Sequence, residues 1–233
     1  LADAQKQGFA EADPTNDVCG FDAARKLAIL SSIGFRANVT FDDVLVEGIE
    51  KIDKSDIQYA KDMGYTIKLL TVALRQENGI ALNVYPAFLP DNHPLSSVKG
   101  AYNAIYVTGN IVDDVMFYGR GAGALPTASA VMGDVISTAQ HILNGSTGTG
   151  MIMTDTKRIP FYSSLKLQNS YYFRLDVDDV TGVLSQIAAA FAENGISICE
   201  VVQKRKTKGL AELVLITELA SRESILQVEK ALQ

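Results

Sequence analysis

The 233-residue chain has few cysteines and histidines, and it has no long apolar run. Its two cysteines, Cys19 and Cys199, lie too far apart in sequence to suggest a disulfide framework, which favours a reducing compartment such as the cytoplasm. The two histidines, His93 and His141, have no cysteine or histidine partners at the spacing of a zinc site, so we expect no metal. No segment approaches the roughly 20 apolar residues that a membrane-spanning helix needs.

The chain also lacks a run of basic residues. Its net charge of −6 at pH 7 argues against nucleic acids and anionic membranes as partners. Hydrophobic residues make up 47% of the chain, as in ordinary globular proteins, and the length suits one large domain or two modest ones. The first residues, Leu1–Lys6, do not resemble a signal peptide. They read as the middle of a helix, so we expect the sequence to begin inside a longer chain.

A predicted helix from Asp22 to about Ile33 carries a charged pair at its start. Asp22 and Lys26 are four residues apart and therefore lie on one face, one turn from each other. Lys26 is expected at the edge of the apolar stripe, which consists of Leu27, Ile29, Leu30 and Ile33. An isolated pair of this kind adds only about 0.3–0.5 kcal/mol to a helix, and a solvated helix start would explain it.

The loop before this helix adds three carboxylates, those of Glu11, Asp13 and Asp17. Carboxylates held this close repel one another unless a cation enters the cluster, and the ammonium group of a substrate is such a cation. The same carboxylates favour the protonated form of Lys26. We therefore interpret Lys26 as a charged proton donor and oxyanion partner in the reduction of an aldehyde, with a proton relay in the reverse direction.

This stretch resembles the substrate-site pattern of homoserine dehydrogenases. The residues that carry the resemblance are Ala4, Gly8, Asp13, Pro14, Asp17, Gly20, Asp22 and Lys26. The resemblance implies that Lys26 handles the proton while a hydride moves to or from a nicotinamide ring. Three acids would then hold the ammonium group of an amino-acid substrate and orient the lysine: Glu11, Asp17 and Asp22.

The residues after this helix predict an α+β arrangement, in which a mostly antiparallel sheet has helices on one side. A short strand is expected at Arg36–Phe41 and a helix at Lys54–Met63, closed by a glycine. A hairpin is expected from Thr66–Leu74 to Ile80–Tyr85, because the residues between them end in Asn-Gly. A second hairpin is expected at Tyr102–Tyr118, with its turn at the Gly-Asn pair in the middle.

The resemblance to homoserine dehydrogenases extends through this sheet. It is carried by the runs Tyr65–Leu70, His93–Leu95 and Asn103–Ile105. In that family the sheet builds the dimer, so a homo-oligomer of at least two chains is expected. We interpret Lys68 as a solvated strand lysine and His93 as a loop histidine before proline, without a role in chemistry.

A glycine-rich turn at residues 119–123 leads into a helix that is predicted from Pro126 or Thr127 to about Asn144. Its G-x-G-x-G spacing is not the dinucleotide fingerprint, and a tight turn into a surface helix would explain it. The family's closing segment has the same pattern, however. That resemblance implies that Gly123 lies beside the nicotinamide end of NAD or NADP, with Gly121 next in line.

The rest of the chain predicts a linker and a second domain. Residues 1–150 are expected to form the catalytic and dimerisation domain, residues 151–167 a linker, and residues 168–233 a smaller domain. In the last segment, a half-buried strand, a helix, two strands and a second helix follow one another. This βαββα order is a ferredoxin-like half-sandwich that ends before its last strand.

The second domain resembles the ACT regulatory domain at two turns. They are Asp179-Val-Thr181-Gly182, where the family usually has proline in place of the threonine, and Glu193-Asn194-Gly195. ACT domains bind small ligands, usually amino acids, so the resemblance implies an effector site at Asp179, Gly182 and Asn194. A plain fold-forming turn explains these residues equally well.

Together, the two resemblances imply interconversion of L-homoserine and L-aspartate 4-semialdehyde with NAD or NADP, in threonine and methionine biosynthesis. No dinucleotide-binding strand–turn–helix unit is recognised. We therefore expect that domain, with a second proton-handling lysine, to lie upstream and this chain alone to be inactive. One alternative is an amino-acid-sensing dimerisation module without catalysis, which an upstream fingerprint would exclude. Another is a dehydrogenase of similar architecture for a different amino acid, which substrate profiling would identify.

Overall fold

The computed structural model describes residues 13–146, 159–205 and 209–232. They divide into two units. The larger takes the described residues up to Leu74 and from Leu82 to Ile159, and the smaller takes Arg75–Ala81 and the described residues from Pro160 on. Within the described part of the chain, no helix is long and apolar enough to cross a membrane.

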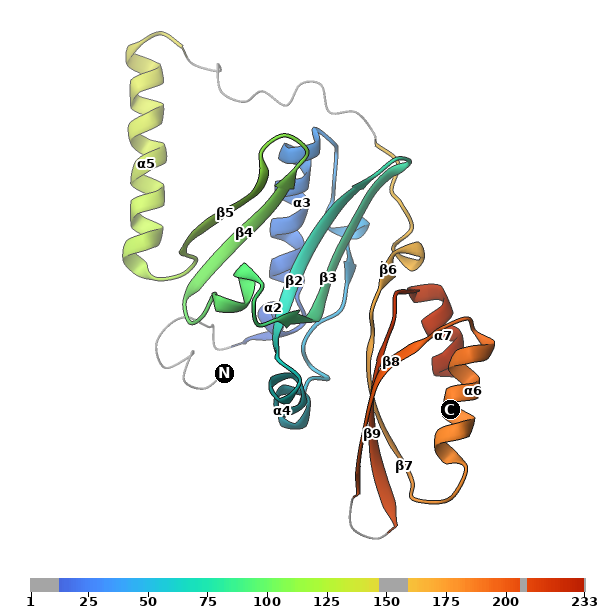
Figure 1. The fold of residues 1–233 in the computed structure, drawn as a ribbon. Coiled ribbons are helices and arrows are strands. Elements are labelled where there is room, and N and C mark those ends of the chain that lie inside the picture. The colour runs from blue at the N-terminus through green and yellow to red at the C-terminus, as the bar shows by residue number, and fades with distance from the viewer. Residues whose placement is uncertain (1–12, 147–158, 206–208, 233) are drawn as a thin grey trace. The chain divides into compact units, whose positions relative to one another are not determined.

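In the first unit, helix α3 lies against a small sheet. The elements of this unit are α2 (Thr15–Val18), α3 (Phe21–Phe35), η1 (Phe41–Asp43), β1 (Leu45–Val46), α4 (Lys54–Asp62), β2 (Tyr65–Gln76), β3 (Gly79–Pro90), η2 (Pro94–Ser97), β4 (Tyr102–Gly109), β5 (Asp113–Arg120) and α5 (Ala124–Leu143). The sheet has the order β1-β3-β2, and β1 runs parallel to β3 with Val46 opposite Val84. Helix α3 runs along one face of the β2–β3 ribbon (Figure 1).

The β2–β3 hairpin is longer than predicted and contributes to both units. Its turn is Glu77-Asn78, and the tip belongs to the smaller unit. There Ile80 donates its backbone N–H to the Pro160 carbonyl at 3.0 Å and accepts the N–H of Tyr162 at 2.8 Å. A Cβ on Gly79 would fall inside contact distance of Pro160, so this pairing requires a glycine. Residues 160–162, which the sequence assigned to a linker, therefore extend the hairpin edge.

The helix α4 confirms the prediction at Lys54–Met63 to within one residue. Its start is fixed by a reciprocal capping box. The Asp53 carboxylate accepts the N–H groups of Ser55 at 2.7 Å and Asp56 at 3.1 Å, and the Asp56 carboxylate accepts the N–H of Asp53 at 2.9 Å. Gly64, with φ of 78°, then turns the chain into β2.

The strand predicted at Arg36–Phe41 is wrong. Arg36 has φ of 50° and ends α3 in a left-handed turn, so no strand can begin at this residue. The backbone N–H and hydroxyl of Thr40 then both donate to the Asp43 carboxylate at 2.8 Å, and this turn begins η1. The short strand of this region is β1, at Leu45–Val46, which the apolar pattern did not single out.

The second predicted hairpin is confirmed as β4 and β5, which pair antiparallel from Tyr102–Arg120 to Gly109–Asp113. Its apolar side chains are largely exposed, and Phe117 is 65% exposed. The twenty residues of α5 include no buried side chain. The α+β class of the chain is also confirmed, with the parallel β1–β3 pair as an addition.

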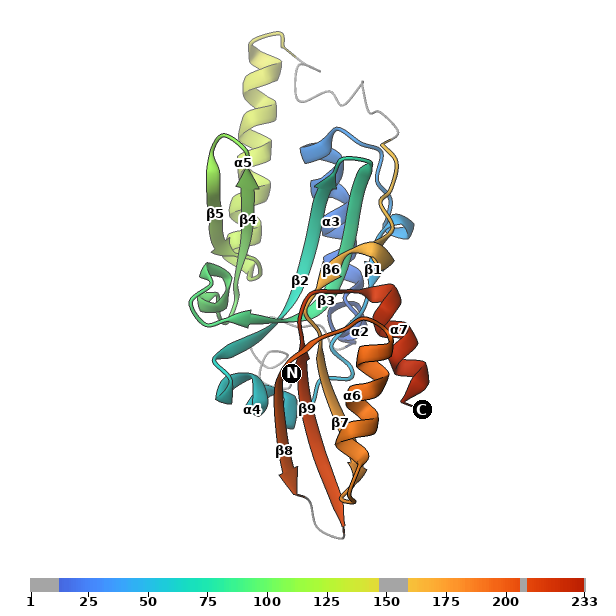
Figure 2. The same cartoon turned by 45° about the vertical axis from the view of Figure 1, so that its right-hand side comes forward.

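The second unit is a three-stranded antiparallel sheet with two helices (Figure 2). Its elements are η3 (Ser164–Lys166), β6 (Gln168–Asn169), β7 (Tyr172–Asp178), α6 (Val183–Glu193), β8 (Ile198–Arg205), β9 (Leu210–Thr217), β10 (Ala220–Ser221) and α7 (Arg222–Ala231). The sheet order β7-β9-β8 and the succession of elements confirm the predicted βαββα pattern. The short strands β6 and β10 form a separate antiparallel pair.

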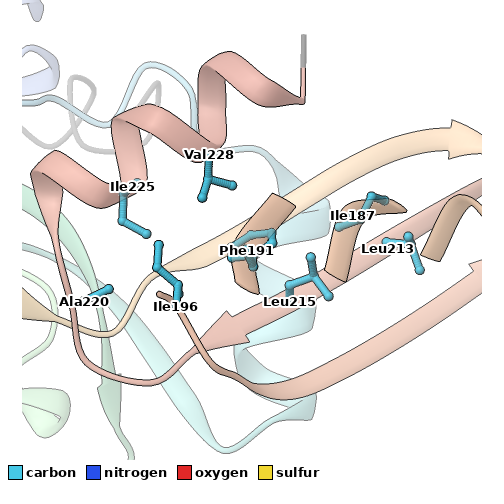
Figure 3. Close-up of a cluster of buried hydrophobic side chains, with 8 residues drawn as sticks. All are labelled: Ile187, Phe191, Ile196, Leu213, Leu215, Ala220, Ile225 and Val228. Carbon is cyan, nitrogen blue, oxygen red and sulfur yellow. The ribbon is translucent and has the colours of Figure 1, made fainter. Parts of the chain in front are cut away.

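A continuous apolar core lies between this sheet and its two helices (Figure 3). It consists of Ile187, Phe191, Ile196, Leu213, Leu215, Ala220, Ile225 and Val228. Phe191 of α6 is fully buried and meets the Phe173 ring of β7 edge-on, with centroids 5.1 Å apart. Phe173 and alternate residues of β7 pack against the core, as the predicted half-buried strand requires.

Candidate functional site

The candidate site lies where the loop from Asp13 to Gly20 enters α3. Asp13 begins this loop and stabilises it: its carboxylate accepts the backbone N–H of Thr15 at 3.1 Å and the Thr15 hydroxyl at 2.6 Å. These hydrogen bonds lower the pKa of Asp13, the side-chain bond being the largest cause. Asp13 therefore shapes the loop.

The predicted pair of Asp22 and Lys26 is confirmed as a close contact. Lys26 Nζ lies 2.6 Å from Asp22 Oδ2, and the two side chains are 61% and 43% exposed for the lysine and the aspartate. Such an exposed pair contributes only about 0.3–0.5 kcal/mol to a helix. The contact matters for geometry, because it fixes the lysine amine beside a carboxylate on an accessible face of α3.

The buried face of α3 shares only Leu27 with the predicted stripe. The buried residues are Ala24, Leu27, Ala28 and Ser31. Ile29, Leu30 and Ile33 are 43–62% exposed, and they continue along the helix from Lys26 at three- and four-residue spacing. Two of them, Ile29 and Ile33, line a groove of about 360 Å³ together with Phe41. Lys26 therefore heads an exposed, largely apolar strip of α3.

Asp17 is exposed and lies in α2, directly before the turn to α3. The turn is closed by the Gly20 N–H, which donates to the Asp17 carbonyl at 3.2 Å. Arg25 of α3 reaches back to α2, where its Nη1 donates to Asn16 Oδ1 at 3.0 Å, and its guanidinium lies 5.4 Å from the Phe41 ring centroid. Asp17 is thus held near the start of α3, whereas Glu11, Ala4 and Gly8 lie outside the described residues.

Sequence reasoning missed a contact between this loop and the segment after β1. The Cys19 thiol hydrogen-bonds to the Glu50 carboxylate, which raises the pKa of Cys19 and lowers that of Glu50. Close by, the Ile49 N–H donates to the Val18 carbonyl at 2.8 Å. No local signal could have revealed these contacts, since the partners are about thirty residues apart in sequence.

Lys68 differs from the predicted solvated lysine. It is partly buried, and its Nζ donates to the Val98 carbonyl. Burial lowers the pKa of Lys68, and the charge of Lys99 adds to the effect. His93 lies in a loop before proline, as predicted; its Nδ1 accepts the Leu95 N–H at 3.2 Å. Both contacts hold the segment between β3 and β4.

The glycine-rich turn after β5 is built around close backbone approach. The Gly121 N–H donates to the Ala101 carbonyl at 3.0 Å, and a Cβ at Gly121 would collide with the Asn103 side chain. Gly123 has φ of 122°, which favours glycine, and it is the N-cap of α5. The first turn of α5 contains no acidic residue. The two predicted cofactor-binding glycines therefore share one turn.

The predicted effector residues fall at opposite ends of α6. Gly182, with φ of 98°, begins the helix, and the Asp179 N–H donates to the Gly209 carbonyl at 2.8 Å beside it. Asn194 ends the helix, where its Nδ2 donates to the Ala190 carbonyl at 2.8 Å. The eleven residues of α6 separate the two ends by roughly 16 Å. The structure thus brings Asp179 and Gly182 together and leaves Asn194 apart from them.

Comparison with known proteins places these features in a family. The family model for homoserine dehydrogenase matches residues 1–136, and the model for the ACT domain matches residues 171–233. The first match contains the acidic loop, the Asp22–Lys26 pair and the glycine-rich turn. The second contains α6 with both of its turns.

Relatives and solved structures agree with both matches. The homoserine dehydrogenase of Bacillus subtilis is 42% identical over 95% of this chain and 51% of its own length, and that of Mycobacterium tuberculosis is 42% identical over 100% of this chain and 54% of its own length. The crystal structure of a homoserine dehydrogenase from Thiobacillus denitrificans superposes with a TM-score of 0.88 at 36% identity, and covers 98% of this chain and 53% of that one. The chain spans about half the length of the curated relatives it matches. With the family's residues at the start of α3 and its fold throughout, the chain belongs to the homoserine dehydrogenase family.

Proposed function

We propose that this chain supplies the substrate-binding and regulatory part of an NAD(P)-dependent homoserine dehydrogenase. The reaction is the interconversion of L-homoserine and L-aspartate 4-semialdehyde, a step in threonine and methionine biosynthesis. The observation that carries the proposal is the Asp22–Lys26 contact of 2.6 Å behind an acidic loop. A plain helix-start pair would have no need of the additional acids that precede it.

In aldehyde reduction, Lys26 Nζ donates a proton to the carbonyl oxygen as negative charge develops there. Asp22 holds the lysine amine in place through a direct hydrogen bond. In homoserine oxidation the proton leaves through a relay in which the same amine takes part. The chemistry requires Lys26 to be accessible, and 61% of its side chain is exposed.

The substrate's ammonium group is assigned to Asp17 and Glu11. Asp22 has two tasks, since it orients Lys26 and also contributes to binding the ammonium group. Asp22 is already in contact with Lys26, so most of the remaining negative charge comes from the other two acids. Asp17 is exposed beside the same turn, which suits a ligand that arrives from solvent. A substrate anchored this way places its side-chain oxygen toward the lysine.

The nicotinamide end of NAD or NADP is assigned to the turn of Gly121 and Gly123. Gly123 places no side chain at the start of α5, and the first turn of α5 has no acid to repel a phosphate group. These features fit the dinucleotide. When bound, it accepts or supplies the hydride, while the chain's own residues position the substrate and move the proton.

The C-terminal unit is assigned an amino-acid effector, with threonine as the first candidate because it is a product of the pathway. Asp179 and Gly182 lie together at the start of α6 and would face the ligand's ammonium and carboxylate groups. Asn194 is roughly 16 Å away along the helix. It would join the site only from the ACT domain of a second chain.

A second chain is also expected at the β4–β5 hairpin, which we assign to dimerisation. This hairpin forms a two-stranded sheet apart from β1-β3-β2, whereas the sequence predicted one sheet for both hairpins. Ile105, Val107 and Phe117 share one face of the hairpin, with Ile105 directly opposite Phe117, and all three are 41–65% exposed. A two-fold partner would cover them. Light scattering of the complete gene product at micromolar concentration tests this assignment, and a strictly monomeric mass would contradict it.

The direct test of the function is an assay of the complete gene product that contains this chain. We expect NAD- or NADP-dependent oxidation of homoserine and reduction of aspartate semialdehyde, followed at the absorbance of the reduced nicotinamide. A panel of other amino alcohols identifies a different substrate, if there is one. A protein that binds amino acids and oxidises none of them would instead be a sensing and dimerisation module.

A further inference from the structure

The acidic loop rests on a segment far away in sequence, Gly48–Glu50. Gly48 lies so close to the loop that a Cβ built on it would fall inside contact distance of the Val18 carbonyl oxygen and 2.6 Å from Cys19 Cα. Real Cβ atoms essentially never approach heavy atoms that closely. Gly48 does not have a left-handed φ, so its requirement is for space and not for an unusual backbone conformation.

Two hydrogen bonds join the same segment to the loop. The Ile49 N–H donates to the Val18 carbonyl at 2.8 Å, and the Cys19 thiol bonds to the Glu50 carboxylate. The bonded residues lie between Asp17 and Asp22 in the chain. A shift of the loop at Val18 and Cys19 must therefore move the acids on both sides of it.

The segment itself is held by the sheet. The Glu47 N–H donates to the Val84 carbonyl at 2.8 Å, which continues the pairing of β1 with β3. The loop also touches this sheet at its other end, where a Cβ on Gly20 would meet the Val84 and Val46 side chains at 3.0 and 3.3 Å. The loop is thus fixed at two points, Gly20 and Gly48. Of the two, Gly48 leaves less space for a side chain.

We infer that Gly48 is a positioning residue for the proposed reaction: by letting segment 48–50 lie directly under the loop, it sets the place at which Asp17 and Asp22 meet the substrate's ammonium group. The inference rests on the proposed function. Gly48 itself touches no substrate and acts through the loop. A methyl group there would lift Val18 and Cys19 by a distance on the order of 1 Å, and a misplacement of that size costs up to about 100-fold in rate.

The test is Gly48→Ala in the complete gene product, with separate measurement of kcat and of KM for homoserine and for the dinucleotide. We expect KM for homoserine to rise by roughly tenfold or more while KM for the dinucleotide stays unchanged. Gly34→Ala is the matched control. It adds the same methyl group to the neighbouring helix α3, where nothing lies within 4 Å. A loss of fold alone would lower the active fraction without changing KM.

A second pair of variants covers the case in which Gly48→Ala does not fold. Cys19→Ala removes one hydrogen bond between the loop and segment 48–50 without adding bulk, and it should raise KM for homoserine about two- to fivefold. Cys19→Ser keeps a donor for Glu50 and should restore most of the affinity.

The outcomes separate this inference from the function it rests on. A wild-type protein that does not oxidise homoserine would overturn both. An active wild type with unchanged KM for homoserine in Gly48→Ala would overturn the positioning role alone. So would unchanged KM in Cys19→Ala, if Gly48→Ala is unfolded.

Discussion

Helices α3 and α6 begin in the same way, but we propose different tasks for them. Each starts at a glycine with positive φ, 78° at Gly20 and 98° at Gly182, and each follows a turn that contains aspartate. Around Gly20 the sheet side chains of Val84 and Val46 leave little space, whereas nothing lies within 4 Å of a Cβ on Gly182. The first helix start is fixed to a sheet and the second is open.

The charges on the two helices differ as well. α3 carries Asp22 and Lys26 in contact on its exposed face, while the first two turns of α6, Val183–Ala189, contain no charged residue. A fixed turn with a charged pair suits proton transfer, which requires geometry within a fraction of an ångström. An open turn at a helix start suits reversible binding of a small ligand. Similar local geometry therefore does not imply similar function.

The largest expected effect is on catalysis. Lys26→Ala in the complete gene product should lower kcat by about 100-fold or more, because it removes the proposed proton donor. Lys61→Ala, at an exposed position near the end of α4, is the control and should leave kcat unchanged. Near-normal turnover by Lys26→Ala would contradict the assignment of proton transfer to the start of α3.

The second prediction concerns the two glycines. Gly182→Ala should lower the free energy of unfolding of its unit by about 1–2 kcal/mol, the cost of a left-handed alanine. Gly20→Ala should cost about 2–3 kcal/mol, because its methyl group must also displace Val84. Amide hydrogen exchange in α3 and α6 measures the two effects separately. Equal losses would mean that the tight packing around Gly20 does not affect the free energy of unfolding.

The third prediction separates the two proposed ligands. Asp17→Asn should raise KM for homoserine about tenfold, since a charged hydrogen bond to the ammonium group is lost, and leave threonine affinity unchanged. Asp179→Asn should weaken threonine binding, measured by titration calorimetry, and leave KM for homoserine unchanged. Glu11→Gln should act as Asp17→Asn does. If each substitution altered both ligands equally, the assignment of separate sites would be wrong.

The smallest effect concerns the thiols. The hydrogen bond to Glu50 keeps the pKa of Cys19 above its ordinary value of 9.0, and desolvation and the Glu50 charge add to the effect. A raised pKa means less thiolate at pH 8 and slow alkylation, with a rate that increases as pH rises. Glu50→Ala should speed alkylation of Cys19 several-fold. Cys199, whose pKa is raised by its own burial and by Glu218, is the internal reference and should not change.

Mass spectrometry of the two cysteine peptides gives both alkylation rates in one sample. An unchanged rate at Cys19 in Glu50→Ala would contradict the hydrogen bond between the loop and segment 48–50. A change at both cysteines would point to a general loosening of the fold. Only a selective change at Cys19 supports the local contact.

Much of the fold could be predicted because its signals are local. Helix α4 is capped by Asp53 and ends before Gly64. Aspartate is a preferred N-cap residue and glycine readily adopts the left-handed turn after a helix, so both residues predict a helix boundary. The strand β7 alternates apolar and polar residues, and its apolar side faces the core. The contact between Asp22 and Lys26 was likewise predictable, because it follows from helical spacing.

The sequence by itself determined the order of the elements, the α+β class and the charged pair, because helical spacing alone puts Asp22 beside Lys26. Only the tertiary structure decided which side of α3 is buried. Ala24 and Ala28 are buried, because small side chains allow close approach, while the larger Ile29 and Ile33 remain exposed. It also decided that Gly48 lies under the acidic loop. That contact joins residues thirty positions apart, and the periodicity of the sequence contains no information about such long-range contacts.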